Sequence, residues 1–162
     1  MDQLDRTLIE LFAAEPRVGV LEASRRLGVA RGTVQARLDR LQRTGIVSGW
    51  GPQLEPSALD HPVTAFLTLE IRQGSAGSGA RVGGHEAVGA HLATIPELLE
   101  ACTITGPGDL WCRVVARSNT DLQRVIDRVL AHDGIVRCST VIALATQVPY
   151  RVLPLLGTVV AD

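Results

Sequence analysis

The sequence contains no lysine and few aromatic residues. All 16 of its basic residues are arginine, which excludes a phosphate-binding loop of the kind that needs a lysine ammonium. The chain has only two Trp, two Phe and one Tyr, which argues against a surface that stacks nucleic-acid bases on aromatic rings. Hydrophobic residues make up 46% and charged residues 20% of the 162 residues. The chain can therefore bury a core.

Long apolar runs, paired cysteines and metal-ligand spacings are also missing. Apolar runs such as residues 141–145 fall far short of the roughly 18 residues that a membrane span needs, and the chain starts with acidic residues where a secretory signal would be basic. The cysteines, Cys102, Cys112 and Cys138, include no C-x-x-C pair and predict reduced thiols in a core. The histidines show no metal-ligand spacing. We expect a cytoplasmic protein with no metal, no cofactor and no membrane partner.

Positive charge is concentrated in one segment. Between Arg17 and Arg43, seven arginines face only Glu22 and Asp39, a net charge of +5 in 27 residues. Because the whole chain carries −1, the remainder carries −6. This asymmetry predicts one part that contacts a polyanion and another that does not.

The basic segment lies within a predicted group of three helices. Apolar residues at helical spacing predict helices over about 3–14, 20–27 and 31–44. Gly28 ends the second helix, and only two residues separate it from the third, which is the pattern of a helix-turn-helix motif. A short extended segment is expected over 46–50.

The third helix is predicted to read DNA. Val34, Leu38 and Leu41 form its buried stripe, and small or polar residues cover its outer face and N-terminal end. Arg37 lies close to the stripe, which predicts a structural ion pair with Asp5 or Glu22. The alternative is an ordinary solvated face on a three-helix bundle. The predicted DNA-contacting residues are Arg25, Arg26, Arg31, Gly32, Thr33, Gln35, Ala36, Arg40 and Arg43.

The last hundred residues predict a sheet with two helices. Strands are expected over 63–71, 98–105, 110–117 and 135–147, and helices over about 84–94 and 119–131, the second capped by Asn119 or Thr120. The order βαββαβ is that of a ferredoxin-like fold with its helices on one face. The other face would be apolar and uncovered, so we expect self-association through a face that includes Val63, Leu67 and Ile71.

Other functions of this topology find little support. The Gly- and Ser-rich residues 74–80 predict a flexible connection rather than a nucleotide-binding loop. An RNA-recognition module needs exposed aromatic residues on both central strands, and Trp111 alone is not a stacking platform. Acylphosphatase-type catalysis needs an Arg and an Asn at a phosphate cradle, and no such motif is present.

Four short motifs occur in order along the chain: Asp2, Leu4, Asp5, Leu8 and Ile9; Arg37, Arg40, Leu41, Gly45 and Ile46; Gly49, Trp50, Leu54 and Pro56; and Gly106 and Asp109. In this order the motifs resemble those of the Lrp/AsnC family, the feast/famine transcriptional regulators. The resemblance covers about residues 2–150. Two departures occur at the start of the recognition helix, where Ala30 replaces the usual capping Ser and Arg31 replaces a frequent Pro.

The resemblance implies an α+β chain that binds double-stranded DNA. It places an N-terminal (winged) helix-turn-helix domain at 1–50, a linker at 51–62, a ferredoxin-like (RAM) domain for effector binding and oligomerisation at 63–150, and a tail at 151–162. It also implies a homodimer through the sheets, often assembled further into an octamer.

The resemblance further implies a small effector, usually an amino acid, bound between subunits near the hairpin turn. Backbone N–H groups of a Gly turn suit a carboxylate, and Asp109 suits an ammonium. The alternative is a plain turn in which Asp109 caps its own loop. The implied effector-site residues are Gly106, Pro107, Gly108 and Asp109, with Ser139 and Thr140 on the last strand.

Two alternative functions remain open. One is an enzyme on the same scaffold, as in the sirohaem decarboxylases, which would need His and Arg around a tetrapyrrole. The other is an architectural DNA-binding protein that takes no effector. Titration with the twenty amino acids separates that protein from an effector-responsive regulator.

Overall fold

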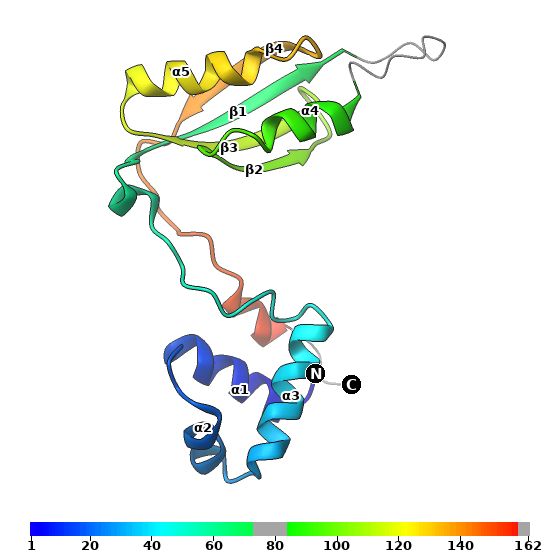
Figure 1. The fold of residues 1–162 in the computed structure, drawn as a ribbon, viewed down its shortest axis with the longest axis vertical. Coiled ribbons are helices and arrows are strands. Elements are labelled where there is room, and N and C mark those ends of the chain that lie inside the picture. The colour runs from blue at the N-terminus through cyan, green and yellow to red at the C-terminus, as the bar shows by residue number, and fades with distance from the viewer. Residues whose placement is uncertain (73–83, 159–162) are drawn as a thin grey trace. The chain divides into compact units, whose positions relative to one another are not determined.

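The computed structural model describes residues 1–72 and 84–158, which form two compact units (Figure 1). One unit contains Met1–Gln53 together with the chain from Val148 onward, and the other contains Leu54–Gln147. The Gly- and Ser-rich segment 74–80 lies outside the described residues. No helix in the described part of the chain is long and apolar enough to cross a membrane.

The first unit is built on three helices, α1 (Gln3–Ala14), α2 (Val20–Leu27) and α3 (Arg31–Arg43). Their apolar faces meet in one small core, which includes Leu8, Ala23, Val34 and Leu38. Gly28 follows α2 with φ of 64°, a conformation that glycine adopts without strain, and so allows the tight turn into α3. The expected helix-turn-helix domain is therefore present.

The wing that the resemblance implies is not present in the described part of the chain. Residues 44–55 contain no strand, so the extended segment expected over 46–50 is absent. Gly45, with φ of 74°, turns the chain after α3, and the Val47 N–H donates to the Leu41 carbonyl at 3.1 Å. The chain then folds back toward α1, and the Trp50 ring packs edge-on against the Phe12 ring with centroids 5.3 Å apart. This returning segment leaves no second strand for a hairpin.

The second unit has the predicted βαββαβ order. Its elements are β1 (Val63–Ile71), α4 (His85–Leu92), β2 (Leu98–Thr103), β3 (Leu110–Ala116), α5 (Asn119–Leu130) and β4 (Ile135–Ile142), and a short 3-10 helix, Pro56–Leu59, precedes them. The strands form one antiparallel sheet in the order β2-β3-β1-β4. The two central strands, β1 and β3, carry most of the core.

The sheet has one covered face and one open face. Leu67 and Leu69 of β1 are fully buried against Val88 of α4 and Val125 of α5. The expectation that Val63, Leu67 and Ile71 lie uncovered is therefore wrong. Both helices need an apolar partner, and this face of β1 supplies it. We call the opposite face the open sheet face; by strand register it carries Thr64, Phe66, Thr68, Trp111, Arg113, Ser139 and Val141.

Several ends differ from those predicted from sequence. Strand β4 stops at Ile142 rather than at residue 147. Ile142 pairs with Ala65 and β1 begins at Val63, so residues 145–147 have no partner on β1. The cap of α5 is Ser118, whose hydroxyl accepts the Asp121 N–H, and neither Asn119 nor Thr120 fills this role. Of the cysteines, Cys112 is buried, but Cys102 is exposed, so the prediction of three core thiols is wrong.

Candidate functional site

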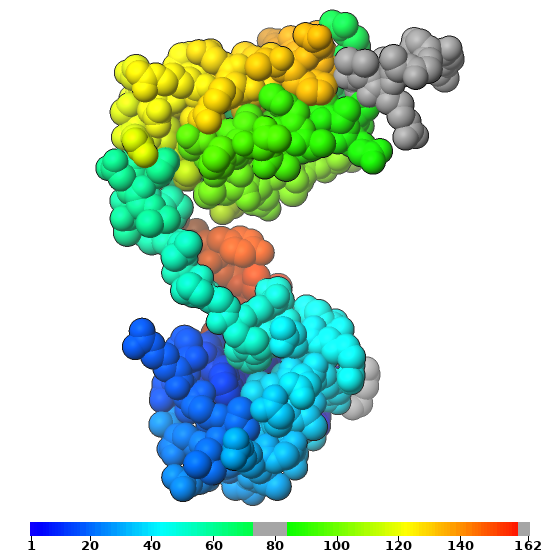
Figure 2. All heavy atoms as spheres, in the orientation of Figure 1, coloured from blue at the N-terminus to red at the C-terminus, as the bar shows by residue number. Residues whose placement is uncertain are grey.

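The outer face of α3 is uncovered. Val34, Leu38 and Leu41 point into the core as predicted, and every other residue of the helix except half-buried Arg37 is exposed. In the space-filling view much of α3, in light blue and cyan, lies at the surface of its unit (Figure 2). All nine predicted DNA-contacting residues are exposed.

The start of α3 lacks a side-chain cap. Ala30 is the N-cap residue and offers only its carbonyl, which accepts the N–H groups of Thr33 and Val34 at 3.0 and 3.2 Å. The N–H groups at a helix start and the positive end of the helix dipole favour an anion. The first turn of α3 contains no acidic residue.

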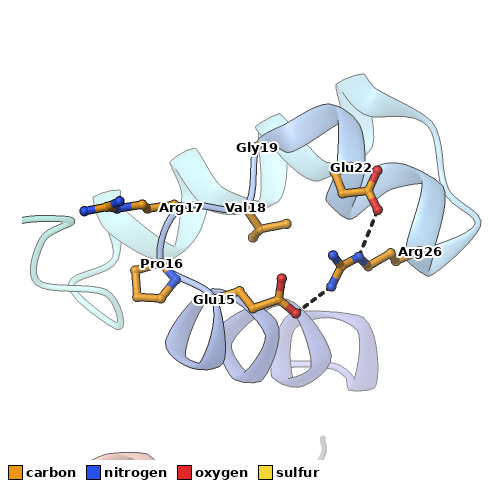
Figure 3. Close-up of a pocket in the computed structure, with 7 residues that line it drawn as sticks. All are labelled: Glu15, Pro16, Arg17, Val18, Gly19, Glu22 and Arg26. Atoms are coloured by element: carbon orange, nitrogen blue, oxygen red, sulfur yellow. Dashed lines mark hydrogen bonds and ion pairs between the residues drawn. The ribbon is translucent and has the colours of Figure 1, made fainter.

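The arginines of α2 are already engaged in ion pairs. Arg26 donates to Glu15 at 2.6 Å and to Glu22 at 3.0 Å, and so joins the end of α1 to α2 (Figure 3). Arg25 lies 3.9 Å from Glu22 and is mostly exposed. Arg26 therefore has a structural role, whereas Arg25 is held only weakly.

The candidates on α3 divide into held and unheld side chains. The Gln35 amide donates to Asp39 at 2.8 Å, and Arg40 is bound by Asp5. Within residues 1–72 and 84–158, no ion pair or side-chain hydrogen bond engages Arg31, Thr33 or Arg43. Gly32 and Ala36 lie on the same exposed surface and add little bulk, so a ligand could approach the helix closely there.

Arg37 forms the predicted structural ion pair. Its Nη1 donates to Asp5 at 2.9 Å and to both oxygens of Asp2 at 2.6 and 2.7 Å, and Glu22 takes no part. The Arg37 hydrogen bond, followed by the Asp5 N–H, lowers the pKa of Asp2 to about 2. The prediction named Asp5 correctly and missed Asp2.

Arg40 shares the same carboxylate. Its Nη2 donates to the two oxygens of Asp5 at 2.6 and 2.5 Å. The Asp5 side chain has no exposed surface, whereas the Arg40 side chain is 46% exposed. Burial opposes ionisation of Asp5, but the Asp2 N–H and the two arginines outweigh it and lower its pKa.

The β2–β3 turn packs closely on β1. Gly106 and Gly108 have φ of 104° and 94°, a region that other residues rarely adopt. A Cβ at Gly108 would lie 2.5 Å from Cγ2 of Thr68 and 3.2 Å from the Leu69 carbonyl oxygen. Gly108 is therefore required both for backbone conformation and for close approach.

Asp109 fastens this turn to the end of β1. Its N–H donates to the Leu69 carbonyl at 2.8 Å, and its Oδ2 accepts the Ile71 N–H at 2.8 Å. This side-chain bond reaches another strand, so it is not the cap of its own loop that the alternative interpretation of the sequence described. Oδ1 has no protein hydrogen-bond partner in the described part of the chain.

Ser139 and Thr140 lie on different faces of β4. Ser139 pairs with Thr68, on the open sheet face, and Thr140 pairs with Leu67, on the face toward the helices. Gly108 packs against the Thr68 side chain. The structure thus brings Ser139, but not Thr140, to the face on which Gly108 packs.

An aromatic cluster on the open sheet face was not predicted. Phe66 and Trp111 stack with ring centroids 5.3 Å apart, and the Arg113 guanidinium lies 5.9 and 5.8 Å from the two ring centroids. From the sequence, Trp111 was expected to stand alone. The period of two in both strands, with Phe66 opposite Arg113 in the register, was the signal that could have found the cluster.

Comparison with known proteins identifies both units. The family model of the AsnC-type helix-turn-helix domain matches residues 1–42. The family model of the Lrp/AsnC ligand binding domain matches residues 64–153, more than half of the chain. The first match lies within the N-terminal unit, and the second covers most of the other unit and extends to residue 153.

Relatives and solved structures match along the whole chain. The HTH-type transcriptional regulator FL11 of Pyrococcus furiosus is 24% identical over 95% of this chain and 96% of its own. The structure of AsnC from Escherichia coli has a TM-score of 0.82, 24% identity, and coverage of 95% and 99%. The feast or famine regulatory protein of M. tuberculosis, complexed with L-methionine, has a TM-score of 0.77, 25% identity, and coverage of 93% and 96%.

Proposed function

Because the chain belongs to the Lrp/AsnC family of transcriptional regulators, we propose that it reads specific duplex sequences with α3 and responds to an amino acid. The observation that carries the DNA-reading role is the set of uncommitted polar side chains on the outer face of α3, led by Arg31, Thr33 and Arg43. Such a face fits the major groove, where a recognition helix reads base edges.

The residues of this face have different tasks. Arg31, Thr33 and Gln35 lie at the N-terminal end of α3, where side chains reach base edges. Gln35 exchanges its Asp39 hydrogen bond for a base contact, and Arg43 in the last turn binds phosphate. Arg25 adds a weaker phosphate contact from α2, and Gly32 and Ala36 allow the helix to approach the groove.

Selection of bound duplexes from a random library tests this division. The wild-type protein is expected to enrich a sequence motif. Gln35→Ala should change the enriched motif, whereas Arg43→Gln should weaken all binding and leave the motif unchanged. A library that shows no enrichment contradicts sequence-specific recognition, and an unchanged motif with Gln35→Ala removes Gln35 from base reading.

The effector site is assigned to the turn of Gly106, Pro107, Gly108 and Asp109. Support comes from the M. tuberculosis regulator, which has the same fold and is complexed with L-methionine, and from the geometry of the turn. In the described part of the chain the N–H groups of Gly106 and Gly108 donate no backbone hydrogen bond and so suit a carboxylate, and Oδ1 of Asp109 can accept an ammonium. Ser139 is retained as a flanking contact, and Thr140 is the weaker candidate.

Calorimetric titration with L-methionine and then the other amino acids tests the effector role. At least one amino acid should release or absorb heat with a saturable isotherm. Asp109→Asn keeps an oxygen that can accept the Ile71 N–H but loses the charge. It should therefore weaken effector binding and leave the melting temperature nearly unchanged. Unchanged affinity would leave Asp109 as a cap only, and no heat with any of the twenty would favour an architectural protein without an effector.

The partner of the open sheet face is assigned to a second copy of the chain. Phe66 and Trp111 on that face form an apolar patch, and Arg113 adds a planar cation that stacks on aromatic rings. Sedimentation should show a dimer at micromolar concentration, or a larger even assembly such as an octamer. Trp111→Glu should shift it to monomer, and a wild-type monomer contradicts this assignment.

A further inference from the structure

Arg40 lies at the boundary between the DNA-reading face of α3 and the start of α1. On α3 it is one turn from Ala36 and from Arg43, both on the exposed face. Its guanidinium nevertheless contacts the fully buried Asp5 of α1. Arg40 thus touches a structural carboxylate and borders the proposed DNA surface at the same time.

Asp5 needs this arginine. Its carboxylate accepts three groups, the Asp2 N–H at 3.0 Å, Arg37 Nη1 at 2.9 Å and Arg40 Nη2. If Arg40 left, the carboxylates of Asp2 and Asp5 would share the single charge of Arg37, and one of the two carboxylates is buried. A buried carboxylate without enough positive charge beside it costs free energy. The Asp5–Arg40 ion pair is therefore expected to persist when DNA binds.

The rest of the Arg40 guanidinium is available. The group has five donors in a fixed planar fork, and only Nη2 is engaged by Asp5. Within the described ranges, Nε and Nη1 have no protein acceptor, and nearly half of the side chain is exposed. The unengaged donors suit a second anion.

We propose that Asp5 is a positioning residue that holds Arg40 so that its free guanidinium edge receives a DNA phosphate. This inference rests on the proposed DNA-binding function. Holding the side chain before binding removes the entropic cost of ordering a long arginine at the interface. Asp5 itself contacts no DNA in this arrangement.

The inference is tested by whether neutralising a carboxylate strengthens or weakens DNA binding. Asp5→Asn and Asp39→Asn each remove one negative charge, and Asp39 is an exposed residue of α3. Electrostatics alone predicts that both tighten binding to a random-sequence duplex. We expect Asp39→Asn to tighten it and Asp5→Asn to weaken it, by about threefold to tenfold, at a temperature where circular dichroism shows both variants folded.

The salt dependence separates positioning from a loss of stability. Loss of one phosphate contact lowers the slope of log affinity against log salt by about 0.9. Asp5→Asn and Arg40→Gln should each lower the slope by about that amount, and the double variant should lower it no further. A weaker affinity of Asp5→Asn with an unchanged slope would overturn the positioning role, and so would additive effects.

A second variant covers the case in which Asp5→Asn does not fold. Arg40→Lys keeps the charge but lacks the planar fork, so it cannot hold Asp5 and a phosphate in fixed geometry at once. It should lose most of the affinity that Arg40→Gln loses, and wild-type affinity overturns the inference. A wild-type protein that binds no duplex at all instead refutes the proposed function.

Discussion

At the start of α1, two carboxylates and two guanidiniums decide how the recognition helix is held. Asp2 and Asp5 form a reciprocal capping box, each side chain accepting the N–H of the other residue. Both then bind Arg37 of α3. A local helix cap and a long-range tie between α1 and α3 therefore depend on the same two residues.

The depressed pKa of Asp2 predicts acid sensitivity of this unit. Because the folded-state pKa of about 2 lies below the ordinary value of 3.8, the contribution to stability is present above about pH 4 and is lost as the pH falls through 2. Urea unfolding at several pH values should show wild type more stable than Asp2→Asn at pH 7, with a difference that shrinks as the pH falls from 4 through 2. A stability difference independent of pH would contradict the ionic origin of the effect.

The cysteines should differ in reactivity. Burial raises the pKa of Cys112 to about 12, so almost no nucleophilic thiolate forms there at neutral pH, whereas Cys102 is exposed on β2. Iodoacetamide at pH 7.5 followed by peptide mass spectrometry should label Cys102 and leave Cys112 unmodified in the folded protein. Both should be labelled in urea, and labelling of folded Cys112 would refute the described packing.

Among the elements, α3 begins without a side-chain N-cap, and one substitution can supply it. Ala30 provides no side-chain acceptor, and a Ser there would accept an N–H of the first turn. Ala30→Ser should stabilise its unit by about 1 kcal/mol, which raises the melting temperature by roughly 4–8 °C for a domain of this size class. Ala36→Ser, an exposed position inside the same helix, is the matched control and should not stabilise. A melting temperature unchanged by Ala30→Ser would contradict the capping argument.

Periodicity predicted most elements because their causes are local. The stripe of Val34, Leu38 and Leu41 and the alternation of β1 depend only on neighbouring residues, and the structure confirms both. The length of β4 depends instead on a distant segment, because residues 145–147 lie past the start of β1 and have no partner there. The covered face of the sheet is the one on which α4 and α5 pack. The sequence of a single strand does not show which face that is.

The candidate site was predicted less completely than the fold. Exposure of the α3 residues follows from the helical period and was correctly expected. The ion pairs of Arg26 with Glu15 and of Arg40 with Asp5 were missed, because these partners lie 11 and 35 residues away in sequence. The pair of Arg26 with Glu22 is local, at i,i+4 spacing, and could have been predicted. The Arg37–Asp5 pair was predicted because Arg37 lies beside the buried stripe of α3, a position that its helical period gives.

Across the whole molecule, the N-terminal unit is completed by the other end of the chain. Residues from Val148 onward belong to this unit, and the 3-10 helix η2 (Leu153–Thr158) lies against α1. From the resemblance, residues 151–162 were expected to be a tail. The chain therefore leaves the first unit after Gln53 and returns to it at Val148, a topology that local patterns do not reveal.

This return predicts that the C-terminal segment protects α1. Leu156 is the partly buried leucine of η2, and burying about half of a leucine contributes about 1 kcal/mol, or roughly fivefold in a local opening equilibrium. Leu156→Glu should therefore speed amide hydrogen exchange in α1 about fivefold. Leu144→Glu is the control, because Leu144 is 97% exposed, and equal exchange in the two variants would show that η2 does not support α1.

The most direct test of the DNA-reading role is the salt dependence of duplex binding with and without the free arginines of α3. Fluorescence anisotropy should follow a selected duplex from about 50 to 200 mM salt for wild type, for the double variant Arg31→Gln with Arg43→Gln, and for Arg124→Gln, an exposed arginine of the C-terminal unit. The double variant should bind more weakly and lose about 0.9 from the salt slope, which is the phosphate contact of Arg43, while Arg124→Gln should match wild type. Equal affinity and equal slope for wild type and the double variant would contradict the assignment of α3 as the DNA-reading helix.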